Sequence, residues 1–336
     1  MYVFQHVLLC LGGISLFLLG LKFMSENMEL LTGEKMKRLL SSCTKNRALG
    51  VLSGVFSTAV LQSSVATNVI LIGFVSNGMI PFLNACAVIM GTNIGTTVTA
   101  QLVSLSGSSG FDITVLGAVM VFIGFIMGFI KRKHYLEIGN VLMGFGMLFF
   151  GLNVVSECIG VFKSYDAFIR FFLVDNVFLL FLNGILITSI VQSSSAVTSV
   201  MVVLGLNGLL SFENAMFLIL GANIGTCLPV IWASLNKSLD SRRTAVFNLC
   251  FNVFGSILLF LPLCLFKGQI SAMFLGFSGT IERQIANFHT LFNVIVTAVL
   301  FPILKPFTNL ISKLIKDKPP KTSNDFVVKG LAKQKN

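Results

Sequence analysis

Charge is scarce in this chain. Only 11% of the 336 residues are charged, whereas a soluble domain carries roughly 25%. Hydrophobic residues make up 55% of the sequence, and the mean hydropathy is +0.89. This balance excludes a water-soluble fold. The sequence therefore predicts an all-α integral membrane protein.

Paired cysteines are also missing. The seven cysteines are odd in number, are scattered along the chain and form no CxxC pair. Most lie in apolar runs, where a thiol packs as a small hydrophobe. We therefore expect no disulfide framework, no metal centre of cysteine or histidine, and no cofactor.

Two further absences exclude other classes of function. No G-x-S-x-G elbow is present, so an intramembrane serine hydrolase would need a base such as His289, and we do not expect an enzyme. The first 21 residues have no positively charged start, so we interpret them as a retained span and not as a signal peptide. The net charge of +11 lies in short loops and in the tail, which is a pattern of membrane topology and not of nucleic-acid binding.

What the chain does contain is a duplication. When the sequence is shifted by 130 positions, residues 54–97 align with 184–227 without a gap, and 17 of the 44 positions are identical. The polar stretch Gln62-Ser63-Ser64 then lies on Gln192-Ser193-Ser194, which Ser195 extends. A later G-x-N-I-G-T motif recurs at 91–96 and 221–226. A polar set repeated inside apolar sequence indicates two copies of one functional unit.

The duplication divides the chain into four parts. Repeat 1 (1–135) is expected to hold a span at 3–24, an interfacial helix at 25–47, a hairpin at 48–77, an interrupted span at 81–103 and a span at 112–130. Repeat 2 (136–266) holds the counterparts 136–157, 158–176, the hairpin 177–207, 211–234 and 244–266. An extra segment (267–305) carries a span at 285–305, and the basic tail (306–336) is predicted to be disordered and cytoplasmic. Two glycines and an asparagine in each G-x-N-I-G-T motif invite local unwinding, although close helix packing would explain them as well.

Arm length favours re-entrant hairpins. Each arm beside Gln62 has 13 or 14 residues and reaches roughly 20 Å, whereas a full crossing needs about 30 Å. With two hairpins and about seven crossings, the N-terminus is outside, the C-terminus is inside, and 20 of the 24 basic residues lie inside. If each hairpin were instead one full crossing, 19 basic residues would lie inside and 5 outside, but the basic run 131–133 would then lie outside. Three crossings separate the two hairpins, so the repeats are predicted to be inverted, as in secondary transporters.

A hairpin tip inside the membrane is suited to hold ions. The second arm starts at the tip, so its N-terminus offers open N–H donors and a partial positive charge to an anion. Serine hydroxyls add donors, and hydroxyl, amide and backbone oxygens suit Na⁺. No Lys or Arg lies in the predicted core, so an anion there would need co-bound cations. That need is a physical reason for cation coupling.

The paired Q-S-S stretches, each followed by G-x-N-I-G-T, resemble the sodium–phosphate cotransporter family of the type II renal carriers and their bacterial relatives. The resemblance spans about 7–305. It implies sodium-coupled import of inorganic phosphate by alternating access, in a bacterial cell (inner) membrane, with phosphate, Na⁺ and the lipid bilayer as partners. The substrate and ion site that it implies consists of Gln62, Ser63, Ser64, Gln192, Ser193, Ser194 and Ser195, with Asn93, Thr96, Asn223 and Thr226 as neighbours. Na⁺ ligands are expected from the same set and from Thr58, Thr188, Asn68 and Thr198.

The two copies are not equivalent, because Val65 stands where the second copy has Ser195. The tail is also too short for the PhoU-type domain that many bacterial relatives carry at the C-terminus. Another small oxyanion or a carboxylate is the alternative cargo, and a passive anion channel is a further alternative. For single residues the plainer interpretations are hydrogen bonding between helices for His289 and a solvated or capping role for Glu26 and Glu157 at the ends of spans.

Overall fold

The structure is a computed structural model that describes residues 2–42, 46–105, 113–162 and 176–316. These residues form helices and turns and contain no strand, which confirms the all-α class. In chain order the helices are α1 (Tyr2–Ser42), α2 (Arg47–Leu61), α3 (Ser64–Ser76), α4 (Phe82–Ser104), α5 (Ile113–Met127), α6 (Lys133–Phe162), α8 (Val177–Val191), α9 (Ser194–Leu206), α10 (Phe212–Gly225), α11 (Cys227–Ser234), α12 (Leu239–Ser278), α13 (Ile281–Leu300) and α14 (Leu304–Leu314).

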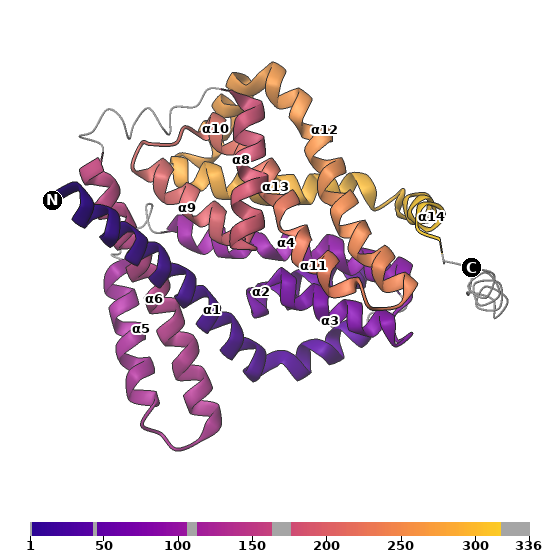
Figure 1. The fold of residues 1–336 in the computed structure, drawn as a ribbon, viewed down its shortest axis with the longest axis horizontal. Helices are drawn as coiled ribbons and strands as arrows, with labels where there is room; N and C mark the ends of the chain where they lie inside the picture. Colours follow the sequence, from indigo (N-terminus) through magenta and orange to yellow (C-terminus); the bar gives the residue numbers. More distant parts are fainter. Residues whose placement is uncertain (1, 43–45, 106–112, 163–175, 317–336) are drawn as a thin grey trace, which may run out of the picture.

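Several of these helices are long and apolar enough to cross a membrane. Among the described residues they are α1, α4, α6, α10 with α11, and α12, and a sixth candidate is α13 with α14, which bend by 85°. The predicted crossing 112–130 corresponds to α5, of which 15 residues are described. Figure 1 shows α5 and α6 as an antiparallel pair that projects from the rest of the bundle. The protein is an integral membrane helical bundle, and the count of seven crossings stays a prediction.

The N-terminal helix differs from the prediction. The predicted span 3–24 and interfacial helix 25–47 are one uninterrupted helix of 41 residues to Ser42. No proline lies in it to break the backbone hydrogen bonds. At ~1.5 Å per residue it reaches about 60 Å, twice the hydrocarbon thickness of about 30 Å, so α1 extends beyond the apolar layer or lies strongly tilted. Figure 1 shows α1 curving past α2 and α3 along its second half.

The predicted unwinding at the first G-x-N-I-G-T motif is wrong, because helix α4 runs through it without interruption. At the second motif the helix is interrupted at Thr226, between α10 and α11, but this residue keeps right-handed angles (φ −67°, ψ −12°), so the interruption is local. The glycines serve close packing instead. A Cβ at Gly91 would overlap the carbonyl oxygen of Val51 on α2, and one at Gly221 would overlap that of Phe181 on α8. Glycine therefore lets the first arm of each unit pack against the helix that follows the unit.

The C-terminal part also differs in detail. Helix α12 continues beyond residue 266, the predicted end of the second repeat, but it is kinked there, at Phe266 (φ −128°, ψ 24°). The predicted extra span 285–305 is α13, which ends at Leu300. The first residues of the predicted disordered tail are helical, because α14 extends to Leu314 and presents its apolar side to the bundle, where Thr308 and Ile311 are buried. Residues 317–336 and most of the predicted interfacial segment 158–176 lie outside the described residues.

Candidate functional site

Each repeated polar stretch breaks a helix at its glutamine. Helix α2 ends at Leu61 and α3 begins at Ser64, with Gln62 in the left-handed region (φ 53°, ψ 23°). The second unit repeats this backbone at Gln192 (φ 61°, ψ 20°), between α8 and α9. These two glutamines have the only positive φ values of non-glycine residues in the described chain. Such angles cost of order 1–3 kcal/mol and persist only where the surroundings enforce them, which marks both positions as specialised.

The following serine starts the next helix in both units. Ser63 and Ser193 adopt extended backbone angles, and their side-chain oxygens accept the amides of Ala66 (3.1 Å) and Ala196 (3.2 Å). Each serine is thus an N-cap. The amides of the two residues after each cap lie in the first helical turn, where N–H groups have no intrahelical acceptor. Both helices therefore begin with open donors.

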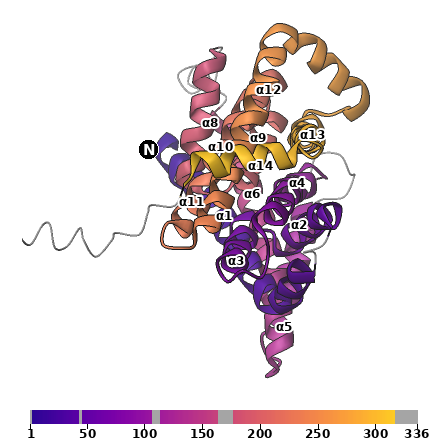
Figure 2. The same ribbon diagram turned by 90° about the vertical axis from the view of Figure 1, so that its right-hand side faces the viewer.

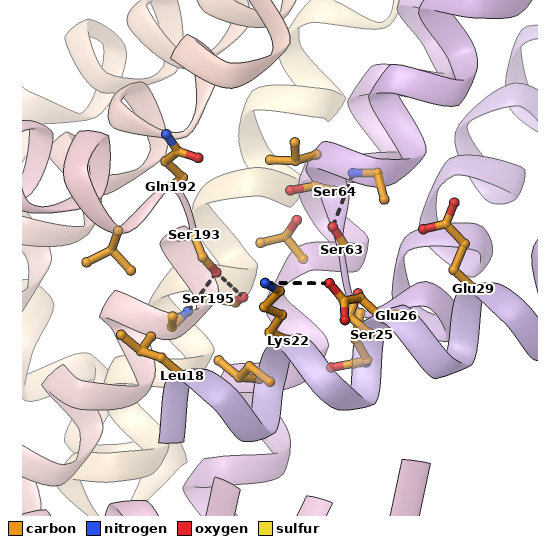
Figure 3. Close-up of a pocket in the computed structure, with 17 residues that line it drawn as sticks. Leu18, Lys22, Ser25, Glu26, Glu29, Ser63, Ser64, Gln192, Ser193 and Ser195 are labelled. Atoms are coloured by element: carbon orange, nitrogen blue, oxygen red, sulfur yellow. Dashed lines mark hydrogen bonds and ion pairs between the residues drawn. The ribbon is translucent and has the colours of Figure 1, made fainter. Parts of the chain in front are cut away.

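The two breaks meet at one cavity of about 610 Å³ (Figure 3). We call Gln62–Ala66 the first tip and Gln192–Ala196 the second tip. The cavity is lined by Gln62, Ser63, Ser64, Val65 and Ala66 of the first tip, by Gln192, Ser193, Ser195 and Ala196 of the second tip, and by Val191 and Thr96. Ser194 is 2% exposed and is not part of the lining. Two stretches 130 residues apart thus contribute hydroxyls and helix N-termini to the same space.

The polar side chains of the two tips are used differently. Gln62 donates from Nε2 to the carbonyl of Ala59 (2.6 Å) and accepts at Oε1 from the hydroxyl of Thr99 (2.8 Å), so its side chain is fixed. Gln192 is exposed, and no hydrogen bond of its side chain is found within the described chain. The hydroxyls of Ser193 and Ser195 lie 3.1 Å apart. The second tip therefore offers the less occupied donors and acceptors.

Helix α1 forms another side of the cavity, which the sequence reasoning missed. It contributes Leu18, Leu21, Lys22, Ser25, Glu26 and Glu29. A basic residue, Lys22, therefore does line the cavity, which the expectation of no Lys or Arg in the predicted core did not include, and Glu26 lines it as well while its side chain stays 59% exposed. The spacing of three and four residues places these side chains on one helical face. That pattern was readable in the sequence, but the tertiary fold decides that this face meets the tips.

A face of α1 is also fixed to the first tip. The hydroxyl of Ser25 donates to the carbonyl oxygen of Leu61, the last residue of α2, at 2.8 Å. Leu61 immediately precedes Gln62, so this bond holds α1 beside the break. Lys22 lies three residues before Ser25, and its ammonium group is 3.8 Å from Glu26 Oε1.

Asn93, Asn223 and Thr226 do not line the cavity. Asn93 donates to Asn248 Oδ1 (3.1 Å) on α12, and Asn223 Oδ1 lies 3.3 Å from His289 Nε2 on α13. The hydroxyl of Thr226 donates to the carbonyl oxygens of Ala222 and Asn223 in α10. Because α4 and α10 remain helical, their asparagines point into the contact with α12 and α13, and Thr96 alone of the four predicted neighbours reaches the tips. His289 bonds as an interhelical residue and is not brought to the tip serines.

The additional predicted Na⁺ ligands are buried beside the tips and outside the cavity lining. Thr58, Thr188 and Thr198 are at most 1% exposed, and their hydroxyls have no hydrogen-bond partner within the described chain. Asn68 accepts from the hydroxyl of Thr92 at 3.0 Å. A buried hydroxyl without a partner is costly, so these three oxygens are available for a ligand.

A second cavity of about 790 Å³ adjoins the first and shares Leu18, Val191 and Ala196 with it. Apart from Asn183, its lining consists of Leu, Ile, Val, Met and Ala side chains from α1, α8, α9, α10 and the turn between α9 and α10. Such a lining cannot replace the hydration of an anion or a cation. Ion chemistry therefore belongs to the first cavity.

Comparison with known proteins gives a consistent result. A model of the Na⁺/Pi-cotransporter family matches residues 16–157 and 167–282. The Bacillus subtilis protein YqeW is 30% identical over 305 residues, which are 90% of this chain and 94% of that protein. The Escherichia coli protein named putative inorganic phosphate export protein YjbB is 25% identical over 313 residues, 92% of this chain but 56% of that longer protein.

The human sodium-dependent phosphate transport protein 2B is 33% identical over 102 residues, 30% of this chain and 15% of that protein. No solved structure matches the chain. The family model covers both tips and the part of α1 that lines the cavity with them. The chain therefore belongs to the Na⁺/Pi-cotransporter family.

Proposed function

We propose that the protein is a sodium-coupled transporter of inorganic phosphate that works by alternating access around the two tips. The observation that carries the proposal is the single cavity lined by both repeated Q-S-S stretches and by the first turns of α3 and α9. Open amides and serine hydroxyls at two helix N-termini are donors suited to a phosphate oxyanion. The membership in the family supports phosphate as the substrate.

Charge balance supports the coupling to cations. The ionisable side chains that line the cavity are Lys22, Glu26 and Glu29, which sum to a formal charge of −1. Two helix N-termini contribute only about 0.3–1 kcal/mol each toward an anion. A phosphate entering this cavity therefore needs further positive charge, which Na⁺ can supply. The hydroxyls of Thr58, Thr188 and Thr198 without hydrogen-bond partners are the oxygen ligands that we propose for it.

For the membrane arrangement we propose that α2–α3 and α8–α9 are re-entrant units of two inverted repeats, in a bacterial inner membrane. Each arm has 13 or 15 residues, too few for a full crossing. The N-terminus is placed outside and the C-terminus in the cytoplasm, in agreement with the distribution of Lys and Arg. A reporter fused to the C-terminus that is active only in the cytoplasm would test this orientation.

The transport proposal is tested with purified protein in liposomes. We expect an inward Na⁺ gradient to drive saturable uptake of ³²P-phosphate, and K⁺ in place of Na⁺ to abolish it. Uptake that does not depend on Na⁺ would contradict the coupling. Competition by excess sulfate, arsenate or a small carboxylate would identify another preferred anion, and flux that does not saturate would indicate a channel.

Import is the direction that an inward Na⁺ gradient imposes on a symporter. The name of the E. coli relative favours phosphate export as a second candidate for the direction in the cell. Phosphate-loaded liposomes with the Na⁺ gradient reversed should release phosphate through the same protein. The internal phosphate content of cells with and without the gene, grown at high external phosphate, would then distinguish import from export.

A further inference from the structure

We propose that the ammonium group of Lys22 contacts the transported anion, and that the carboxylate of Glu26 competes with the anion for this group. The proposal rests on the proposed function, since it concerns how the same cavity takes phosphate. It goes further by giving a role to a face of α1 that lies outside both repeated stretches.

The geometry places Lys22 between the two tips. In Figure 3 its side chain extends into the space between the labelled residues of the first and second tips. The bond from Ser25 to Leu61 fixes α1 less than one turn further along the same face. Within the part of the chain that the structure describes, Lys22 is the only basic residue of the cavity lining.

The ion pair that holds Lys22 is weak. Its N–O distance is 3.8 Å, at the limit of an ion pair, whereas Lys37 and Glu34 on the same helix form a hydrogen-bonded pair at 2.7 Å. The side chains of Lys22 and Glu26 are 69% and 59% exposed, so an entering ion can reach both. An ammonium group has three donors, and no hydrogen bond of this one is found within the described chain. Glu26 therefore neutralises the charge of Lys22 only weakly, and the ammonium group can exchange Glu26 for another anionic partner.

An anion that binds at the tips competes with Glu26 for Lys22. When Lys22 turns to the anion, the cavity lining offers no other basic residue to Glu26 and Glu29 within the described chain. The cavity then favours the entry of a cation more strongly than before. By the reciprocity of binding equilibria, a bound cation in turn favours the exchange of Lys22 from Glu26 to the anion. Lys22 and Glu26 thereby link anion binding to cation binding.

The test measures binding of ³²P-phosphate to the purified full-length protein in nanodiscs at saturating Na⁺, so that Na⁺ occupancy is the same throughout, with three variants. Lys22→Ala should weaken binding about ten- to a hundredfold, the range for losing a hydrogen bond to a charged group. Lys22→Arg, which keeps the charge, should bind more tightly than Lys22→Ala. Glu26→Gln removes the competitor and should strengthen binding roughly two- to fivefold, as expected for an exposed ion pair.

Two controls separate an anion contact from a structural role. Lys37→Ala and Glu34→Gln break the other ion pair of α1, which does not line the cavity, and should leave phosphate binding unchanged. The double variant Lys22→Glu with Glu26→Lys restores an ion pair but moves the ammonium group by one turn. Binding should remain weak if Lys22 contacts the anion. Recovery of wild-type binding would show that only the pair matters and would overturn the proposal.

Other outcomes also decide. Wild-type affinity in Lys22→Ala, or weaker phosphate binding in Glu26→Gln, would refute the role of the pair. If Lys22→Ala does not fold, as judged by its melting in detergent, the decision falls to Glu26→Gln and to the double variant. A wild-type protein that binds and transports no phosphate would instead refute the proposed function.

Discussion

At the scale of single residues, the two tips show how one serine can serve both the fold and the site. Ser63 and Ser193 cap α3 and α9 through their side-chain oxygens and also line the cavity. A cap is worth typically about 1 kcal/mol, so a stability measurement by itself would not reveal the second role. A serine that caps another helix away from the cavity is therefore the natural comparison.

Ser193→Ala and Ser211→Ala form such a pair. Ser211 caps α10 by accepting the amide of Asn214 at 3.2 Å and does not line the cavity. Both substitutions should lower the free energy of unfolding in detergent by about 1 kcal/mol. Only Ser193→Ala should also weaken phosphate binding, by about tenfold, because it removes a donor at the tip. Equal phosphate affinity in the two variants would show that Ser193 is a cap and nothing more.

At the scale of elements, the same contact recurs in both units. Gly54 and Gly91 bring α2 and α4 together, and Gly184 and Gly221 do the same for α8 and α10, each with no room for a Cβ. The duplication in sequence is therefore a duplication of a helix–helix contact as well as of a tip. This contact holds the first arm of each unit rigid up to the glutamine where the helix breaks.

Gly221→Ala should therefore destabilise the protein. The added methyl would overlap the carbonyl oxygen of Phe181, and separating α8 from α10 should cost about 1–3 kcal/mol of unfolding free energy. Gly73→Ala is the control, since Gly73 lies inside α3 with nothing within 4 Å of its Cβ position. This substitution should be neutral or should stabilise the helix by about 0.5–1 kcal/mol. Thermal unfolding of both variants in the same detergent tests the prediction, and equal stability of the two would contradict it.

At the scale of the whole molecule, the site exists only because three distant segments meet. Residues 18–29 of α1, the first tip and the second tip share one cavity although up to about 180 positions separate them in the sequence. Figure 2 shows α8, α9 and α10 above α2, α3 and α4, and α1 contributes to the cavity together with both tips. A ligand in this cavity should therefore shield residues of both tips at once.

Protection of single cysteines tests this arrangement. In a background without the native cysteines, Ser64→Cys and Gln192→Cys should react with a water-soluble maleimide, and phosphate with Na⁺ should slow both reactions. Asn77→Cys is the control, because Asn77 is exposed at the end of α3 and does not line the cavity. Its labelling rate should not change. Protection at one tip without the other would mean that the ligand does not bridge them.

The sequence by itself determined the membrane class, the family and the position of both tips. These features are local or repetitive. A low fraction of charged residues indicates that the chain is surrounded by lipid. The helix break at Gln-Ser-Ser arises because a serine caps the next helix directly after the preceding helix ends. The resemblance of the paired motifs to the sodium–phosphate cotransporters is confirmed by the family match.

The tertiary structure alone decided what each helix does at the tips. A glycine in a helix can end it or admit a neighbour, and only the close approach of Val51 to Gly91 shows that the second role applies. Asn93 and Thr96 are three residues apart, yet only Thr96 reaches the cavity, because an intact helix fixes the direction of each side chain. Lys22 and Glu26 line the cavity because α1 packs beside the tips. The residues next to them in the sequence do not indicate a long-range contact of this kind.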